Sequence, residues 1–201
     1  MNQVIENIKS RRSIRKYVDK GVPSDVIKEI IDAGRCAPSS HNSQPWRFIV
    51  IEDKKKIEEL SDYIKNWFKK RLIFGKIAGL FYKKVKNEIE SAKKRLFTED
   101  DFFFYDAPLL ILICSKAGRF SIQDCSLAAE NMMLAGRSLG IGSCWIGFAD
   151  MVVNKNRKLM AELGIPKGYK IMAHLIFGYP VKFPESAFPR NKEANVIKWI
   201  K

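Results

Sequence analysis

Apolar residues in this chain come in short runs, and the longest strongly apolar stretch covers only residues 109–114. Crossing a bilayer takes roughly 20 consecutive apolar residues. The run therefore predicts a buried strand of a globular protein. The chain also opens with polar and charged residues where a secretion signal would be hydrophobic, so we expect a cytoplasmic protein that does not interact with membranes.

Helical and strand-like patterns alternate along the sequence without an internal repeat or a linker. With 201 residues, of which 46% are apolar, the chain is long enough to bury one substantial core. We therefore expect a single domain spanning residues 1–201, with Ser24 capping the second helix and Gly34 ending it. The predicted helices cover residues 4–11, 24–34, 121–139 and 155–163, and the predicted strands cover residues 46–51, 108–115, 142–148 and 170–178.

Two parts of the chain give less regular patterns. Residues 54–104 predict a helical excursion, with two helices broken near residues 75–79, that would cover a site. Its aromatic run at residues 102–105 suits either the core or stacking on a ligand. Residues 180–201 contain several prolines, which predicts an extended C-terminal arm that a second subunit would support.

The formal net charge is +14, which suits a nucleic acid or an anionic small molecule. The lysines are spread as single positions over residues 54–94, without the interleaved aromatic residues of an RNA-binding motif. We therefore interpret most of this charge as a solvated face that also attracts anionic cofactors, and we expect no nucleic-acid partner.

The four cysteines and two histidines show no metal-ligand spacing. No C-x-x-C pair occurs, and His41 and His174 lie far apart in the sequence. We therefore expect no metal site. Cys114, Cys125 and Cys144 lie in apolar stretches, where reduced cysteine packs as a small hydrophobic residue.

Residues 11–15, R-R-S-I-R, place guanidinium groups and a hydroxyl at the end of a predicted helix. Guanidinium forks match phosphate oxygens, and each charge-assisted hydrogen bond contributes about 1.5–3 kcal/mol. The motif therefore suits a phosphate, although a short basic run at the end of a helix is also commonly solvated.

Two further segments are candidates for ligand binding, one rich in polar side chains and one rich in glycine. Residues 38–46, P-S-S-H-N-S-Q-P-W, collect hydroxyls and amides that could bond the edge of a heteroaromatic ring or could simply cap a turn. Residues 139–147, L-G-I-G-S-C-W-I-G, allow backbone amides to approach a planar ligand. Their spacing does not match G-x-G-x-x-G, and close helix–strand packing also explains these glycines.

Together these motifs resemble the nitroreductase (FMN reductase) family. The matching segments are residues 11–15, residues 38–46, A-P at 107–108, residues 139–147 and F-G-Y-P at 177–180, and their order and spacing agree across residues 1–199. The resemblance implies an α+β fold with a mixed central sheet surrounded by helices. It also implies an interlocked homodimer, with FMN sites at the interface and an exchanged C-terminal arm.

The resemblance also implies which residues bind the cofactor. Arg11, Ser13 and Arg190 would contact the FMN phosphate with Arg12 beside them, and Arg15 would reach the pyrimidine edge of the flavin. From the other subunit would come Pro38, Ser39 and Ser40, with Asn42 and Gln44 nearby. The backbone amides of Ile146 and Gly147 would face the N5 side of the ring, while Ser40 and His41 would line the acceptor pocket.

The family chemistry implied is a ping-pong transfer of hydride from NADH or NADPH, through FMN, to nitroaromatic, quinone or similar conjugated acceptors. Because the flavin carries this chemistry, we expect no catalytic acid, base or nucleophile from the protein. We interpret His174, within an apolar strand, as a satisfied core or interface residue. The alternatives are a reductive dehalogenase, a flavin-consuming enzyme or a non-enzymatic flavin-binding protein of the same fold.

Overall fold

A four-stranded sheet forms the centre of the computed structural model, which describes residues 2–73, 96, 98, 101–184 and 197–200. The strands are β1 (Arg47–Ile51), β2 (Leu109–Lys116), β3 (Gly142–Trp145) and β4 (Tyr169–Gly178), in the order β1-β2-β4-β3. All three strand pairs are antiparallel. An isolated parallel bridge from Ser13 to Ser143 lies outside the named strands, so the described strands form an antiparallel sheet and not the mixed sheet that was expected.

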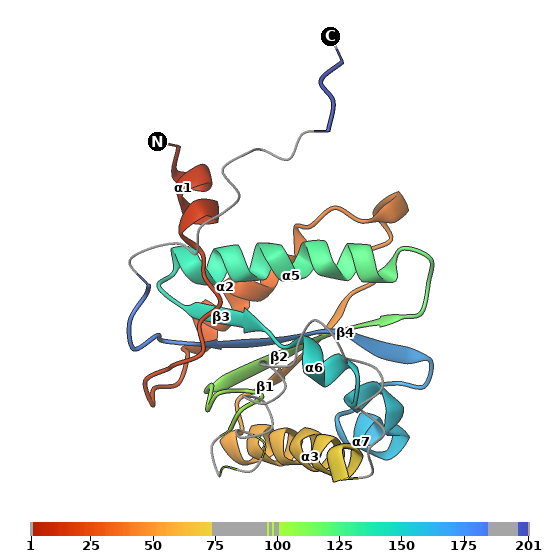
Figure 1. Cartoon of the computed structure of the whole chain (residues 1–201). Helices are drawn as coiled ribbons and strands as arrows, with labels where there is room; N and C mark the ends of the chain where they lie inside the picture. The colour runs from red at the N-terminus through yellow and green to blue at the C-terminus, as the bar shows by residue number, and fades with distance from the viewer. Residues whose placement is uncertain (1, 74–95, 97, 99–100, 185–196, 201) are drawn as a thin grey trace.

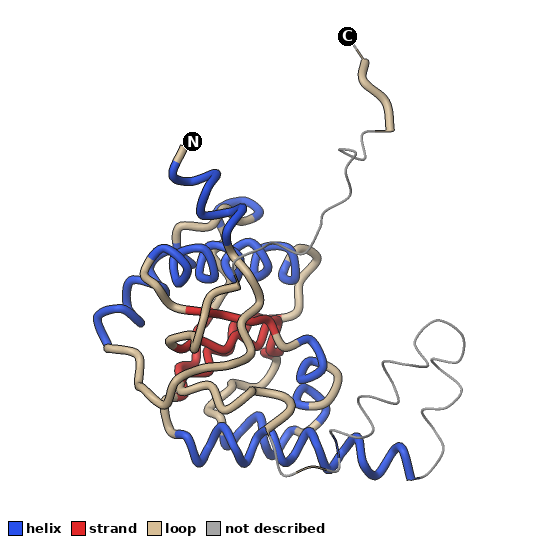
Figure 2. The backbone as a smooth tube through the Cα atoms, turned by 60° about the vertical axis from the view of Figure 1, so that its left-hand side comes forward, coloured by secondary structure: helices blue, strands red, loops and turns tan. Residues whose placement is uncertain are grey.

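Helices cover both faces of this sheet, so the predicted α+β fold is confirmed (Figures 1 and 2). On one face α2 (Ser24–Arg35) and α5 (Ser121–Ser138) pack together, and α1 (Gln3–Ser10) lies on the outer side of α5. The other face carries α3 (Lys54–Ile73), α6 (Gly147–Asp150), η2 (Val153–Lys155) and α7 (Arg157–Glu162). A short 3₁₀ turn, η1 (Ser40–Asn42), lies in the loop before β1.

The central strands are buried on both sides, which explains their continuous apolar sequence. Every residue of β2 except Lys116 is buried, and β4 is buried from Ala173 to Gly178. Two core clusters result, one between the sheet and α2 with α5, and one between the sheet and the α3 side. The predicted strands at residues 108–115 and 170–178 are thus confirmed to within one residue.

Several predicted boundaries were wrong. The third strand ends at Trp145, because Ile146 leaves the strand conformation and α6 begins at Gly147. The helix predicted for residues 155–163 is divided at Asn156, whose side chain caps α7 by accepting hydrogen bonds from the N–H groups of Lys158 and Leu159. The predicted break near residues 75–79 lies outside the described residues, as does most of the C-terminal arm, including Arg190.

The roles predicted for Ser24 and Gly34 in α2 were also wrong. Ser24 is the first helical residue, and the capping position belongs to Pro23. Gly34 lies inside α2 and is buried against α5, where an added Cβ would lie 2.7 Å from Cγ of Met132. This glycine therefore permits close contact between two helices.

The three buried cysteines are free thiols, as expected. Burial raises the pKa of both Cys114 and Cys125 to about 12, because a buried thiolate lacks solvation. They therefore pack as neutral, apolar side chains. Among the described helices none is sufficiently long and apolar to span a membrane.

The segment after α1 follows the edge of β3. The Ile14 N–H donates to the Ser143 carbonyl at 2.9 Å, and the Val18 N–H donates to the Tyr179 carbonyl at 2.9 Å. Glycine at position 142 allows this close approach, because an added Cβ would lie 2.8–2.9 Å from three atoms of the Ile14 side chain. The β3 edge and residues 13–17 thus form one unit.

Replacing Gly142 with alanine is expected to destabilise the protein by about 1–3 kcal/mol, since the branched Ile14 side chain is buried and has no room to move aside. Urea unfolding followed by circular dichroism would measure the change. Gly21→Ala is the matched control, because nothing lies within 4 Å of its added Cβ and its unfolding free energy should stay within about 0.5 kcal/mol of wild type. Equal stability of the two variants would contradict the prediction.

Candidate functional site

Arg11, Arg12 and Arg15, which we call the arginine cluster, lie on the segment that follows the β3 edge. Arg11 donates through Nε to Glu130 of α5 at 3.1 Å. Arg12 folds back, so that Nη1 donates to the carbonyl oxygens of Lys9 at 2.6 Å and Arg11 at 2.5 Å. The end of α1 and the β3 edge therefore hold these guanidinium groups in defined positions.

A buried nitrogen of this cluster has no acceptor among the described residues. Nε of Arg12 is buried and has no hydrogen-bond partner among the described residues, and the same is true of Nε of Arg137 near the end of α5. A buried guanidinium N–H without an acceptor is costly, and an anionic oxygen would satisfy it. The two side chains thus fit the requirements of a bound phosphate.

Sequence reasoning missed Arg137. Two helical turns separate it from Glu130, the partner of Arg11, so the two residues share one face of α5. Its guanidinium lies 4.2 Å from the ring centre of Phe183. Two residues before Phe183, the Val181 N–H donates to the Lys16 carbonyl, which holds this part of the chain next to the segment after α1. The available signal was a lone arginine before the L-G-I-G segment, on the same helical face as an acidic residue.

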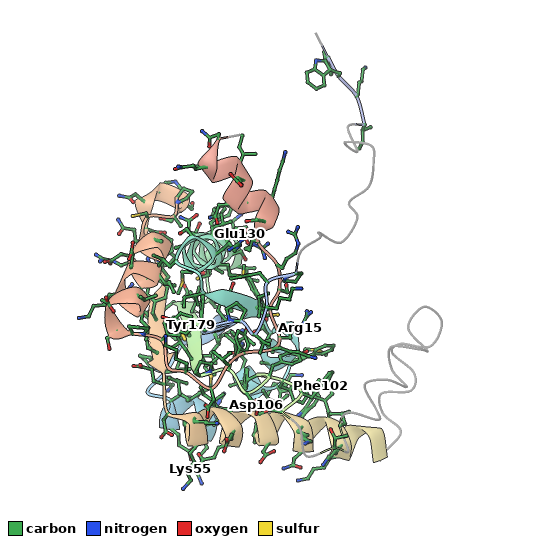
Figure 3. The ribbon with its side chains drawn as sticks, turned by 90° about the vertical axis from the view of Figure 1, so that its left-hand side faces the viewer. Arg15, Lys55, Phe102, Asp106, Glu130 and Tyr179 are labelled. Carbon is green, nitrogen blue, oxygen red and sulfur yellow. The ribbon has the colours of Figure 1, made fainter. Side chains whose placement is uncertain are left out.

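Arg15 points toward the α3 side of the molecule and lies near two tyrosines. Its guanidinium is 5.8 Å from the ring centre of Tyr105, and Figure 3 shows it on the same side as Phe102. Tyr17 donates its hydroxyl hydrogen to the Ile14 carbonyl at 2.7 Å. Burial raises the pKa of Tyr17 well above its usual range, and the Arg15 charge opposes this effect only in part.

Cys144 of β3 lies beneath the same segment. Burial raises the pKa of its thiol, while the charge of Arg15 and hydrogen bonding with Ser13 lower it. The neighbourhood of Ser13, Arg15 and Cys144 is therefore electropositive. It offers cationic and hydroxyl donors to a ligand but no ionised nucleophile.

Five aromatic side chains form a continuous series that we call the aromatic wall: Tyr105, Phe102, Phe103, Phe68 and Phe148. Ring centres along the series are 6.1, 5.4, 5.6 and 6.0 Å apart, distances typical of interacting aromatic rings. The wall begins beside Arg15 and ends next to Gly147. Phe103 belongs to the core, as one of the two alternatives for residues 102–105 expected, and stacking on a ligand stays a prediction, while Phe148 at the far end of the wall is 56% exposed.

The turn that carries most of the wall is organised by Asp101. Oδ1 of this carboxylate accepts hydrogen bonds from the Ser61 hydroxyl and from the N–H groups of Phe103 and Phe104, at 3.0 and 2.9 Å for the two amides. Oδ2 accepts from the Asp106 N–H at 3.3 Å. One acidic side chain thereby fixes the path of the turn.

The two amides predicted to face a bound ring differ in their bonding. The Ile146 N–H donates to the His174 carbonyl at 2.9 Å, so it is already used within the sheet. Gly147 begins α6, and no hydrogen bond among the described residues uses its N–H. Because no atom lies within 4 Å of an added Cβ at Gly147, the remaining backbone donor is accessible there.

The polar loop at residues 38–44 is held away from the arginine cluster. The Ser40 N–H donates to Asp124 of α5 at 3.0 Å, whereas Arg11 contacts Glu130 on the same helix. A rise of about 1.5 Å per residue separates these points by about 9 Å along the helix axis. Figure 1 shows the loop beyond the end of α5 opposite α1. Within one chain the arginine cluster and the polar loop therefore lie at separate points along α5.

Internal hydrogen bonds give the loop a defined shape. The Gln44 N–H donates to Oγ of Ser39 and its Nε2 donates to Oδ1 of Asn42, both at 3.0 Å. His41 is exposed and its Nδ1 lies 3.0 Å from Oγ of Ser40, while Pro38 is exposed. His41, Asn42 and Gln44 have positive φ angles, an uncommon conformation for side-chain-bearing residues.

His174 was expected to be a satisfied core or interface residue; its burial is confirmed, but one of its two ring nitrogens is not satisfied among the described residues. The side chain is 1% exposed, and its Nδ1 lies 2.6 Å from Oδ1 of Asp150. Its Nε2, however, is buried without a partner among the described residues. Within the described residues, no group of three or more histidine, cysteine or acidic side chains could hold a metal ion.

The structure is that of an α+β protein with arginines at one end of an aromatic wall and, at the other, a backbone donor without a partner among the described residues, an arrangement that suits an anionic, planar ligand. The chain belongs to the nitroreductase family, whose model matches residues 8–179.

Individual relatives agree with this assignment. A protein from Methanothermobacter thermautotrophicus with the provisional name NADH dehydrogenase/NAD(P)H nitroreductase is 32% identical, over 90% of this chain and 79% of that protein. The crystal structure of a Bacteroides fragilis nitroreductase with bound FMN is 30% identical, has a TM-score of 0.77 and is covered over 100% of both chains. An iodotyrosine deiodinase from Thermotoga neapolitana is 26% identical over 96% of each chain.

Proposed function

We propose that this protein is an FMN-dependent oxidoreductase that transfers hydride from NADH or NADPH to conjugated organic acceptors such as nitroaromatics and quinones. The observation that carries the proposal is a pair of buried guanidinium nitrogens without an acceptor among the described residues, Nε of Arg12 after α1 and Nε of Arg137 near the end of α5. Membership of a family that includes a nitroreductase solved with FMN supports the same conclusion.

The residues present fit FMN at both of its ends. Arg11, Arg12 and Ser13 would hold the phosphate through charge-assisted hydrogen bonds, with Arg137 as an additional contact and Arg190 as a candidate from the arm. Arg15 would face the pyrimidine edge of the ring, and the Gly147 N–H would face its N5 side.

When bound, FMN would supply the hydride-transfer chemistry between a nicotinamide and a second substrate, so the redox chemistry would belong to the cofactor. The protein contributes binding and electrostatics. The positive charge of Arg15 favours added negative charge on the ring, and the aromatic wall supplies an apolar surface on which a planar acceptor stacks. No protein acid, base or nucleophile is assigned. We propose that nicotinamide and acceptor use this one surface in turn, so that the nicotinamide would leave before the acceptor binds and the kinetics would be ping-pong.

We further propose that the working unit is a homodimer. Helix α1 buries none of its residues, and Val4, Ile5 and Ile8 are 65%, 47% and 51% exposed, as expected of a face that a second subunit covers. A partner would also supply the loop with Pro38, Ser39 and Ser40 to the flavin, with Asn42 and Gln44 nearby and His41 beside the acceptor. This arrangement explains why one chain holds only part of the site.

A second candidate activity is reductive dehalogenation by the same bound cofactor. It is favoured by the full-length similarity to the deiodinase from Thermotoga neapolitana. Both activities require FMN, so they differ only in the acceptor.

The purified protein tests the proposal directly. We expect it to be yellow after reconstitution with FMN, to be bleached anaerobically by NADH or NADPH, and to be reoxidised by a nitroaromatic or a quinone. Reoxidation by an iodinated phenol instead would favour the dehalogenase. Protein that stays colourless with excess FMN would overturn the proposal for both activities.

A further inference from the structure

His174 is attached to both ends of the short segment that carries Gly147. Its backbone carbonyl accepts the Ile146 N–H at 2.9 Å, and its side-chain Nδ1 contacts Oδ1 of Asp150 at 2.6 Å. Between these two contacts lies α6, which has only four residues. Helices this short are not stable by themselves, so their geometry depends on tertiary contacts.

The bonding pattern determines the tautomer of the imidazole. A carboxylate only accepts hydrogen bonds, so Nδ1 must carry the hydrogen that bonds Asp150. Nε2 is buried and has no partner among the described residues. A leucine at this position would fill the surrounding apolar cluster without leaving an unsatisfied nitrogen. The histidine is therefore explained by its contact with Asp150 and not by core packing.

From this geometry we infer that His174 is a positioning residue, which clamps residues 146–150 so that the Gly147 N–H keeps a fixed direction toward the flavin. This inference rests on the proposed FMN function, because the flavin is what the amide would contact. Gly147 itself has no side chain to hold it in place, and its surroundings are open. The orientation of the donor must then come from its neighbours, and His174 contacts the residues on both sides.

The clamp should affect both the affinity for FMN and the reduction potential of the bound flavin. A backbone donor aimed at the ring stabilises added negative charge only while its direction is held. Releasing Asp150 from His174 lets α6 reorient, so oxidised FMN should bind less tightly and reduced FMN should lose even more affinity. The reduction potential of the bound flavin should therefore fall.

Two substitutions of His174 separate a clamp from a packing role. His174→Leu retains apolar bulk but removes the donor to Asp150. His174→Asn restores a donor, because its amide nitrogen is the same number of bonds from Cα as Nδ1. Asp150→Ala removes the acceptor at a residue whose side chain is 34% exposed, so it is expected to fold even if His174→Leu does not. Ile176→Val, at a buried site farther along β4, is the control for a general loss of stability.

Three measurements are needed: hydrogen exchange of residues 146–152 in the FMN-free protein, the affinity for FMN, and the two-electron potential of the bound flavin. In His174→Leu and Asp150→Ala we expect tenfold faster exchange and tenfold weaker FMN binding. We also expect the potential to fall by about 30 mV, which corresponds to a tenfold loss of affinity specific to reduced FMN. His174→Asn should return each quantity most of the way to wild type, and Ile176→Val should leave all three unchanged.

The outcomes distinguish the inference from the proposed function. Wild-type protein that binds no FMN refutes the proposed function, and the clamp with it as a flavin-positioning device. Normal FMN binding by the wild type with unchanged exchange in Asp150→Ala refutes the clamp alone. So does faster exchange without a change in potential, or a failure of His174→Asn to restore what His174→Leu loses.

Discussion

Replacing Arg11 and Arg15 together with alanine is expected to weaken FMN binding by about 10²- to 10⁴-fold while leaving the protein folded. Each charge-assisted hydrogen bond to an anionic ligand contributes about 1.5–3 kcal/mol, and the double variant loses at least two such interactions at opposite ends of the cofactor. Titration of the FMN-free protein, followed by quenching of flavin fluorescence, would give the dissociation constant.

The fold should survive this change, because neither arginine contributes much to stability. The ion pair between Arg11 and Glu130 is partly exposed, with side-chain exposures of 23% and 42%, and pairs of this kind contribute less than about 1 kcal/mol. Arg157→Ala removes an exposed positive charge at the start of α7, away from the site, and should bind FMN nearly as well as wild type. Unchanged flavin affinity in the double variant would refute the assigned site.

The elements that sequence patterns predicted best are those whose burial is continuous. Strands β2 and β4 lie between two helical layers, so both faces are apolar and the pattern itself marks their ends. The end of β3 could not be predicted in this way. Its apolar pattern continues through Ile146, but the backbone leaves the strand conformation at that residue and α6 begins at Gly147.

The arginine cluster was recognisable from sequence, whereas its supporting contacts were not. Residues 11–15 are adjacent in the chain, so their chemistry is visible in the letters. Arg137 and the pair of Asp150 with His174 join the site only through folding, across large sequence separations. A single arginine or histidine gives only a weak local signal of such a role, because the residues that it contacts lie far away in the sequence.

The polar loop shows a second reason why part of the site could not be predicted from the sequence. Its composition predicted ligand chemistry, and its hydrogen bonds through Ser39, Asn42 and Asp124 give it a stable shape within one chain. In the proposed homodimer, the ligand that the loop contacts depends on the opposite subunit. A motif that works across an interface can be recognised in the sequence, but its partner residues cannot.

Asp101 is expected to be the most consequential acidic residue for stability near the site, and Asp101→Ala should destabilise the protein by about 2–4 kcal/mol. The substitution leaves the N–H groups of Phe103 and Phe104 and the Ser61 hydroxyl without their acceptor, in a turn whose two phenylalanines are 3% and 0% exposed. Water reaches such a turn poorly, so it replaces these bonds only in part.

Thermal unfolding would show this loss as a fall in the melting temperature of roughly 5–15 °C, since each kcal/mol corresponds to about 2–4 °C in a domain of this size. Asp101→Asn should lose much less, because its side-chain oxygen still accepts hydrogen bonds from the two amides. Asp62→Ala, at an exposed position on α3, serves as the control and should unfold close to wild type. If the melting temperature of Asp101→Ala equals that of the control, the carboxylate does not organise the turn. If its melting temperature falls but its affinity for FMN is unchanged, the aromatic wall contributes to the acceptor surface and not to cofactor binding.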